Sequence, residues 1–319
     1  MKRAAIFAAV IVAAIAGPAL ADPAKPPVAD QGVVERSRVE LAPSGHPFKQ
    51  LVIENPLGDV RVEGYDGHAI MIETRKRAPD EDTLDRLRVS LVPNADGTVR
   101  ITTTADGGHE VKPVGRGAVR IDLLIHAPRD ARVDAAAAAG KLELVNMDAG
   151  GELDTSSGAI SVLNVQGALV THTVTGPMTI AEAFGSVDAQ TVASNLNLDG
   201  IGGERLIASA GHGTIAGRRV RSRDIELTTT DGKIVLEAEA ALRGHLVVSS
   251  LRGDVTVRLH RKGALVVQAR GVKVDLGGQA QTQPNGLVVW NDGQPPAGEL
   301  PTLVELRSRY GAVQFAVVQ

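Results

Sequence analysis

Seven similar segments decide the fold: AGKLEL (139–144), SGAISV (157–162), TGPMTI (175–180), SNLNLD (194–199), HGTIAG (212–217), DGKIVL (231–236) and RGDVTV (252–257). Their first apolar residues recur every 18 to 21 positions, at Leu142, Ile160, Met178, Leu196, Ile215, Ile234 and Val255. A fixed period of this length is typical of coiled repeats whose units stack on one another. The segments therefore predict a repeat region over residues 139–276.

A second apolar column follows each of these segments, which indicates two strands per repeat. Its members are Leu153, Leu169, Val187, Leu206, Ile225, Leu246 and Leu265. Residues two positions after the first column are aliphatic in six of the seven repeats, as one face of a β-strand requires. A coil of about 18 residues buries too few aliphatic side chains to offset its backbone entropy, so neighbouring coils must stack. We predict an all-β chain and, more finely, a parallel β-solenoid with about 18 to about 19 residues per coil.

The first 21 residues have the three parts of an export signal. Lys2 and Arg3 are followed by an apolar run over 4–16 and by Ala19-Leu20-Ala21, a small-residue cleavage site. Thirteen apolar residues are too few to cross a bilayer as a helix, and no later stretch is longer. We expect a cleaved signal peptide and export to the periplasm or the cell surface.

The remaining segments differ in composition from the repeats. Residues 22–47 are rich in proline and predict a tether with one strand at 33–41. Residues 48–138 alternate apolar and polar side chains, which predicts a β-rich segment with one short helix at 80–88. We expect residues 277–319 to form a C-terminal cap, because the end of a stack exposes unpaired strand edges.

Composition excludes several classes of function. The chain has no cysteine, so disulfides, thiol catalysis and cysteine-ligated metals are excluded. Removing Lys2 and Arg3 changes the net charge from −3 to −5, which argues against a general affinity for nucleic acid. Acidic residues of the repeats fall at inconsistent phases, and the eight histidines show no metal-binding spacing. We therefore predict no catalytic residues, no metal and no cofactor, with a carbohydrate-active β-helix enzyme as an alternative.

One group of basic residues is a candidate binding site. They occupy the corners before the second strand in the later repeats, at Arg218, Arg219, Arg221, Arg223, Arg243, Arg261 and Lys262. Because the coil period is nearly constant, these side chains should stack along one edge, here called the basic ridge. Such a ridge could bind an anionic envelope polymer or lipid phosphate through bidentate arginine contacts. The alternative is a solvated edge whose charges oppose aggregation.

Three stretches carry a resemblance to a known family: NPLGDVRVEGYDG (55–67), IDLLIHAP (121–128) and SSGAISVLNVQGALVTHTVTGPMTI (156–180). With these the sequence resembles the DUF4097 family of exported bacterial β-strand-repeat proteins, often called adhesins. The resemblance implies a right-handed β-solenoid at the cell envelope without known enzymatic activity, and it supplies no binding residues. We expect a non-enzymatic protein that presents its repeat surface to an envelope polymer or protein. A structural or assembly factor of the envelope is a further alternative.

Overall fold

The computed structural model describes residues 32–43, 46–105, 119–294 and 300–318. These residues are all-β as predicted, since apart from one four-residue helix, α1 (Glu81–Leu84), every regular element is a strand. The Asp80 side chain accepts a hydrogen bond of 2.7 Å from the Thr83 backbone N–H and caps that helix. The expected signal peptide lies outside the described residues.

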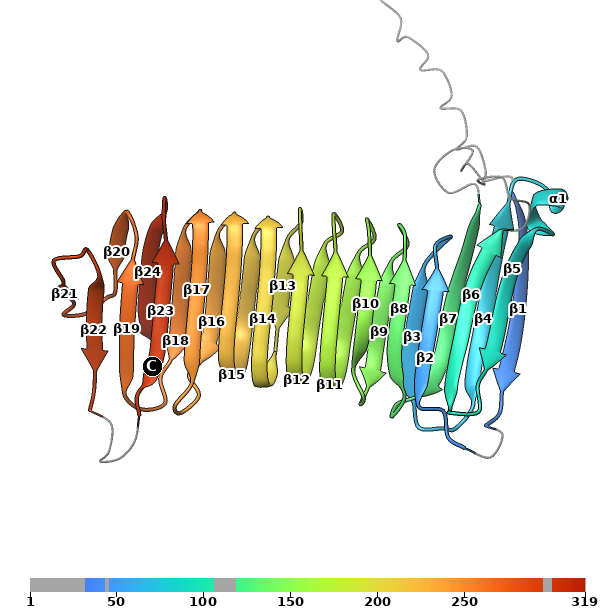
Figure 1. Ribbon diagram of the computed structural model, residues 1–319, viewed down its shortest axis with the longest axis horizontal. Helices are drawn as coiled ribbons and strands as arrows, with labels where there is room; N and C mark the ends of the chain where they lie inside the picture. Colours follow the sequence, from blue (N-terminus) through green and yellow to red (C-terminus); the bar gives the residue numbers. More distant parts are fainter. Residues whose placement is uncertain (1–31, 44–45, 106–118, 295–299, 319) are drawn as a thin grey trace, which may run out of the picture. The chain divides into compact units, whose positions relative to one another are not determined.

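The strands pair into two ladders, and the order of their strands along the long axis can be followed in Figure 1. Ladder I consists, in spatial order, of β1 (Val33–Leu41), β4 (Ile70–Ala78), β7 (Arg120–Pro128), β3 (Val60–Tyr65), β9 (Leu142–Met147), the first parts of β11 (Ile160–Thr173) and β12 (Met178–Thr191), β13 (Leu196–Asp199), the first part of β15 (Ile215–Asp231), β16 (Ile234–Glu239), β18 (Val255–His260), β24 (Ala312–Val318) and β20 (Lys273–Asp275). Ladder II consists of β5 (Leu87–Pro93), β6 (Thr98–Ala105), β2 (Gln50–Asn55), β8 (Arg132–Ala137), β10 (Gly151–Thr155), the later parts of β11 and β12, β14 (Gly202–His212), the later part of β15, β17 (His245–Arg252), β23 (Thr302–Ser308), β19 (Leu265–Arg270), β22 (Val288–Asp292) and β21 (Gln281–Thr282).

The first apolar column of the sequence is a continuous row inside ladder I. Leu142 pairs with Ile160, Ile160 with Met178, and the row continues in parallel register to Val255. Every member is buried. The period of the repeats is therefore the length of chain that separates one strand from its neighbour in the same ladder.

The stacking predicted for the second apolar column is confirmed for its five middle members and wrong for Leu153 and Leu265. Leu169, Val187, Leu206, Ile225 and Leu246 stand side by side in ladder II. Leu153, however, pairs with the buried Thr171, because Leu169 lies opposite Gly151. At the other end Leu246 pairs with Val304 instead of stacking on the coil of Leu265.

The first and last coils of the described chain are interleaved between other coils. Strand β2 lies between β6 and β8, and β3 lies between β7 and β9. In the same way β23 lies between β17 and β19, and β24 lies between β18 and β20. Residues 302–318, expected as part of a terminal cap, thus form a coil inside the stack.

Antiparallel strands cover three of the four ends of the described ladders, and at the fourth end β20 pairs parallel with β24. The strand expected at 33–41 is present as β1 and pairs antiparallel with β4 along all nine residues. Strand β5 covers β6, and β22 with β21 covers β19. Antiparallel pairs need only short connections, so they can end a parallel stack without adding another coil.

Candidate functional site

The outer face of ladder I carries a groove of about 620 Å³ near its N-terminal end, here called the ladder I groove. Alternate residues of a strand point to the same face, so five neighbouring strands place two rows of side chains there. The first row runs Arg36, Arg75, Asp122, Asp59 and Lys141. The second row runs Arg38, Glu73, Leu124, Arg61 and Glu143.

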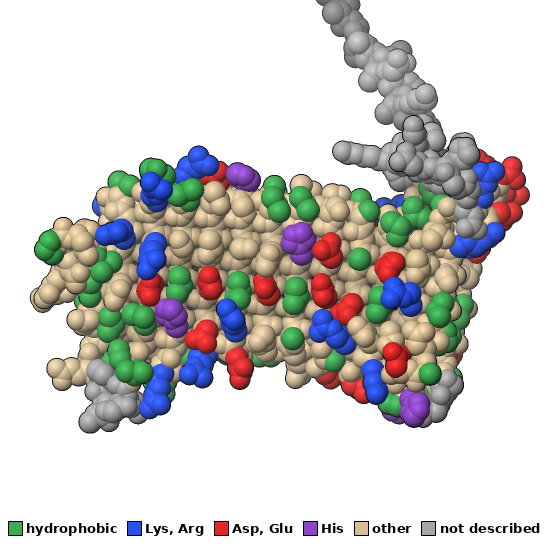
Figure 2. Space-filling view, viewed as in Figure 1, with side chains coloured by type: hydrophobic (Ala, Val, Ile, Leu, Met, Phe, Trp, Pro, Cys, Tyr) green, Lys and Arg blue, Asp and Glu red, His purple; other side chains and the backbone are tan. Residues whose placement is uncertain are grey.

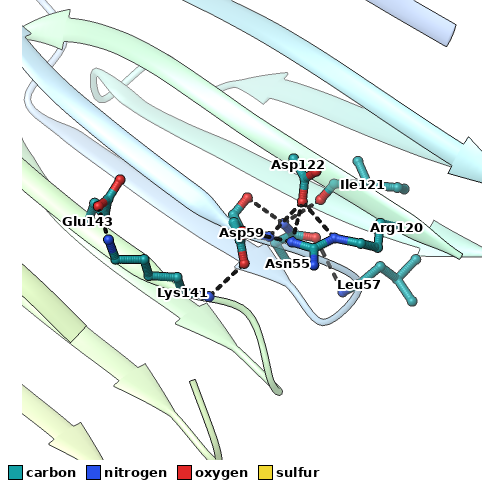
Figure 3. Close-up of polar contacts among 8 residues, drawn as sticks. All are labelled: Asn55, Leu57, Asp59, Arg120, Ile121, Asp122, Lys141 and Glu143. Carbon is teal, nitrogen blue, oxygen red and sulfur yellow. Dashed lines mark hydrogen bonds and ion pairs between the residues drawn. The ribbon is translucent and has the colours of Figure 1, made fainter. Parts of the chain in front are cut away.

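The two aspartates of the first row are held by one arginine, Arg120, as Figure 3 shows. Its guanidinium lies 2.7 Å from Asp59 and 2.8 Å from Asp122. Asp59 also accepts the backbone N–H of Lys141 at 2.8 Å, which joins β9 to the turn before β3. The pKa of Arg120 is raised, because its hydrogen bonds to the two carboxylates outweigh its partial burial. These carboxylates are therefore already paired within the protein.

Asn55, in the NPLGD stretch, makes hydrogen bonds in the interior beneath the groove. Its side chain is fully buried and donates to the Ile121 carbonyl at 2.8 Å, while its oxygen accepts from the Thr103 hydroxyl at 2.6 Å. The backbone N–H of Leu57 donates to the same oxygen. The motif thus satisfies polar groups at the buried corner beneath the groove.

Glu143 in the second row is also paired. It accepts hydrogen bonds from the Lys141 ammonium group and, at 3.2 Å, from Arg61. Partial burial opposes ionisation of Glu143, but these two cations hold its pKa below the usual range. A general acid needs the opposite shift, so Glu143 is unsuited to proton donation near neutral pH.

Arg36 and Arg75 differ from the other cations of the groove. They stand directly opposite each other across the antiparallel pair of β1 and β4. Among the described residues neither arginine forms an ion pair. Asp122, which stands beside Arg75 in the first row, is already bound by Arg120. Like charges opposite each other across a ladder are destabilising. This end of the groove therefore offers two guanidinium groups to an anion from outside.

The basic ridge lies where the chain passes from ladder I to ladder II, within β15 and in the links after β16 and β18. Figure 2 shows basic and acidic side chains mixed along the lower edge of the molecule. Arg219, Arg221 and Arg261 form ion pairs with Asp199, Glu239 and Asp292, and Lys262 also binds Glu239. Hydrogen bonds from Arg219 and Lys262 lower the pKa of Asp199 and Glu239, respectively. The ridge is thus partly neutralised.

The other ridge residues have varied surroundings. Arg218 and Arg223 form no ion pair with the described part of the chain, and both are exposed. Arg219 and Arg243 have φ angles of 51° and 59°, in the left-handed region that side chains with a Cβ rarely adopt. Arg219 is held there by its contacts with Asp199 at 2.7 Å and Glu182 at 2.8 Å.

Among the described residues five histidines lie within 3.6 Å of a carboxylate on a neighbouring strand, and in two of these pairs the partners stand directly opposite each other in consecutive repeats, an arrangement that the sequence analysis missed. His172 lies 3.3 Å from Asp154, and His212 lies 3.1 Å from Asp231. In both of these pairs the two partners are one coil period apart in the sequence, so the period itself is the signal that could have found them. The described residues contain no group of three or more side chains arranged to hold a metal ion.

Comparison with known proteins gives likeness of structure only. No family model and no curated relative matches the chain. A candidate cell adhesion protein from Clostridium sporogenes is 12% identical over 90% of this chain and 100% of its own, with a TM-score of 0.27. A candidate adhesin from Bacteroides fragilis is 10% identical over 89% and 97%, with a TM-score of 0.41. A candidate lipid-binding protein from Parabacteroides distasonis is 11% identical over 90% and 97%, with a TM-score of 0.36.

Within the part of the chain that the structure describes, no helix is long and apolar enough to span a bilayer.

Proposed function

We propose that this protein is a non-enzymatic binding protein of the cell envelope that holds an anionic polymer in the ladder I groove. The observation that carries the proposal is the pairing of Arg36 with Arg75 on an outer face, without a carboxylate for either among the described residues. Arginine presents a planar fork of donors that matches carboxylate and phosphate groups. A bound anion would remove the repulsion between the two guanidinium groups.

The carboxylates of the groove support a binding role over catalysis. Asp59 and Asp122 are engaged by Arg120, and Glu143 is engaged by Lys141 and Arg61. Polysaccharide cleavage needs a carboxylic acid that can donate a proton beside a second free carboxylate or base. A groove whose acids are already paired to cations suits recognition of a charged ligand.

The proposal also covers the fold, the family and the cellular location of the protein. We propose that the coils form a right-handed parallel solenoid, supported by the parallel register in which each repeat pairs with the next. We propose membership of the DUF4097 family on the three resembling stretches at 55–67, 121–128 and 156–180. Export to the periplasm or cell surface is supported by the signal-like pattern of residues 1–21.

The proposal is tested by binding of the full chain to polygalacturonate, an anionic polysaccharide, at about 20 and 150 mM salt. The variant R36S/R75S removes the unpaired arginines of the groove and should weaken binding about tenfold or more, since each charged hydrogen bond is worth about 1.5 to 3 kcal/mol. Binding of the wild type should also weaken at the higher salt concentration.

The matched control is R218S/R223S, which removes the same charge from the basic ridge. We expect this control to bind polygalacturonate as the wild type does. If R218S/R223S loses binding and R36S/R75S does not, the ridge is the polymer site and the groove is not. If both variants bind as tightly as the wild type, neither surface holds the polymer.

A further inference from the structure

A second groove, here called the ladder II groove, lies near the C-terminal end and brings three arginines together. Its volume is about 580 Å³, and strands β15, β17, β23 and β19 line it. Thr228, Ser249, Arg307 and Arg270 form one row across these strands. Arg309 follows at the end of β23. The described residues that line this groove include no aspartate or glutamate.

The interleaved last coil creates this cluster. Strand β23 enters between β17 and β19, so Arg307 stands directly beside Arg270. Neighbouring strands are only about 4.8 Å apart, and like charges at paired positions destabilise a ladder. Strand β17, the other neighbour of β23, has Ser249 and no basic residue at this position of the row. The fold therefore places two guanidinium groups together at a position where the chain could have separated them.

The contacts of the three arginines leave an excess of positive charge. Arg307 lies 2.6 Å from Glu305, Arg270 donates to the Asn285 carbonyl at 2.5 Å, and the Arg309 guanidinium lies 5.4 Å from the centre of the Tyr310 ring. Glu305 thus compensates one of the three charges, and a charge of about +2 remains at the groove.

We propose that the ladder II groove binds the phosphate monoester of a saccharide. A phosphate monoester carries about −1.5 to −2 charges at pH 7, which matches this excess, and its oxygens fit the forks of arginine. Thr228, Thr230 and Ser249 supply outward hydroxyl groups beside the arginines. Tyr310 is 61% exposed and adds an aromatic surface next to Arg309. The volume exceeds that of a phosphate group alone and leaves room for a sugar.

This site is independent of the polymer site proposed above. It lies on ladder II near the end of the chain, whereas the ladder I groove is built by strands near its beginning. Variants at one groove should therefore leave binding at the other unchanged, and the two proposals can fail separately.

The test measures binding to the full chain by titration and by thermal unfolding, with glucose 6-phosphate, inorganic phosphate and glucose as probes. We expect glucose 6-phosphate to bind most tightly and to raise the Tm of the wild type. The variant R270S/R307S should bind glucose 6-phosphate at least about tenfold more weakly. R86S/R258S, a control with the same change of charge at two exposed arginines outside both grooves, should bind it as the wild type does.

Loss of fold is excluded by the Tm without ligand. R270S/R307S should match or exceed the wild type, because the repulsion between the two arginines is removed. A second variant, R309S, keeps the contact of Arg270 with Asn285 and should also weaken binding. Equal affinity of the wild type and both variants for glucose 6-phosphate would overturn the site. If inorganic phosphate binds as tightly as glucose 6-phosphate, the groove does not recognise the sugar. If glucose binds as tightly as glucose 6-phosphate, the groove does not recognise the phosphate.

Discussion

Single glycines at the turns show how closely the coils approach. Gly140, Gly158 and Gly176 occupy the turns of three successive repeats and do not have left-handed φ angles. A Cβ added to Gly158 would lie 1.8 Å from the Gly140 carbonyl oxygen, and one added to Gly176 would lie 1.6 Å from the Gly158 oxygen. Glycine is required there because the backbone of one turn rests on the backbone of the next.

Gly158→Ala should therefore destabilise the protein by at least about 3 kcal/mol, at the upper end of the range for overpacking, because backbone must move to admit the methyl group. Ser157→Ala, at the exposed neighbouring position, should change stability by less than about 0.5 kcal/mol. Denaturant unfolding followed by circular dichroism measures both. Equal unfolding midpoints for the two variants would show that the turns are not in this close contact.

Three strands of the stack end at the same kind of hydrogen bond, in which a Thr or Ser hydroxyl accepts the backbone N–H of the glycine three residues later. Thr173, at the end of β11, is fully buried, accepts the backbone N–H of Gly176 at 3.1 Å and contacts the Gly158 carbonyl of the preceding turn at 3.3 Å. Thr155 accepts the N–H of Gly158 in the same way at 3.1 Å. At the end of β23 the Ser308 hydroxyl accepts the backbone N–H of Gly311 in the same way at 2.9 Å. The same hydroxyl-to-glycine hydrogen bond is thus present in the interleaved coil as well.

Thr173→Val keeps the shape of the side chain but removes the acceptor of the buried Gly176 N–H. An unsatisfied buried donor costs about 1 to 3 kcal/mol, so the free energy of unfolding should fall by that amount. Thr179→Val, on the exposed face of β12, should leave it almost unchanged. Urea unfolding of both variants is the measurement. A Thr173→Val protein as stable as the wild type would mean that another group satisfies this N–H.

Across the whole molecule, the sequence predicted the interior of the stack and not its ends. The apolar period reproduces the register from Leu142 to Val255, because each of those coils rests on the next in sequence. Leu265 follows Leu246 by one ordinary repeat period, so the spacing gives no sign that β23 enters between their coils.

Both arginine pairs escaped prediction for a related reason. Arg36 and Arg75 meet across an antiparallel pair at one end, and Arg270 and Arg307 meet across the interleaved coil at the other. In neither pair are the two arginines one coil period apart in the sequence. A prediction that stacks each repeat on the next therefore does not place them side by side.

The interleaved last coil should be essential for the fold of the C-terminal end. Removal of residues 302–319 takes away four buried hydrophobic side chains among the described residues, Val304, Leu306, Val313 and Phe315, and leaves β17 and β19 without the strand between them. At about 1.5 to 3 kcal/mol for each, the loss is about 6 to 12 kcal/mol, as large as the whole stability of many domains.

We therefore expect the truncated chain to lose cooperative unfolding and to aggregate through its open strand edges. The control replaces Gln281–Asp292 with a short Gly-Ser linker, which removes the antiparallel pair β21 and β22 but keeps every interleaved strand. That chain should still unfold cooperatively, with a lower Tm. Calorimetry and size-exclusion chromatography compare the two. A truncated chain that stays monomeric, with a Tm within a few degrees of the wild type, would contradict the role assigned to the last coil, because β19 would then have to pair directly with β17.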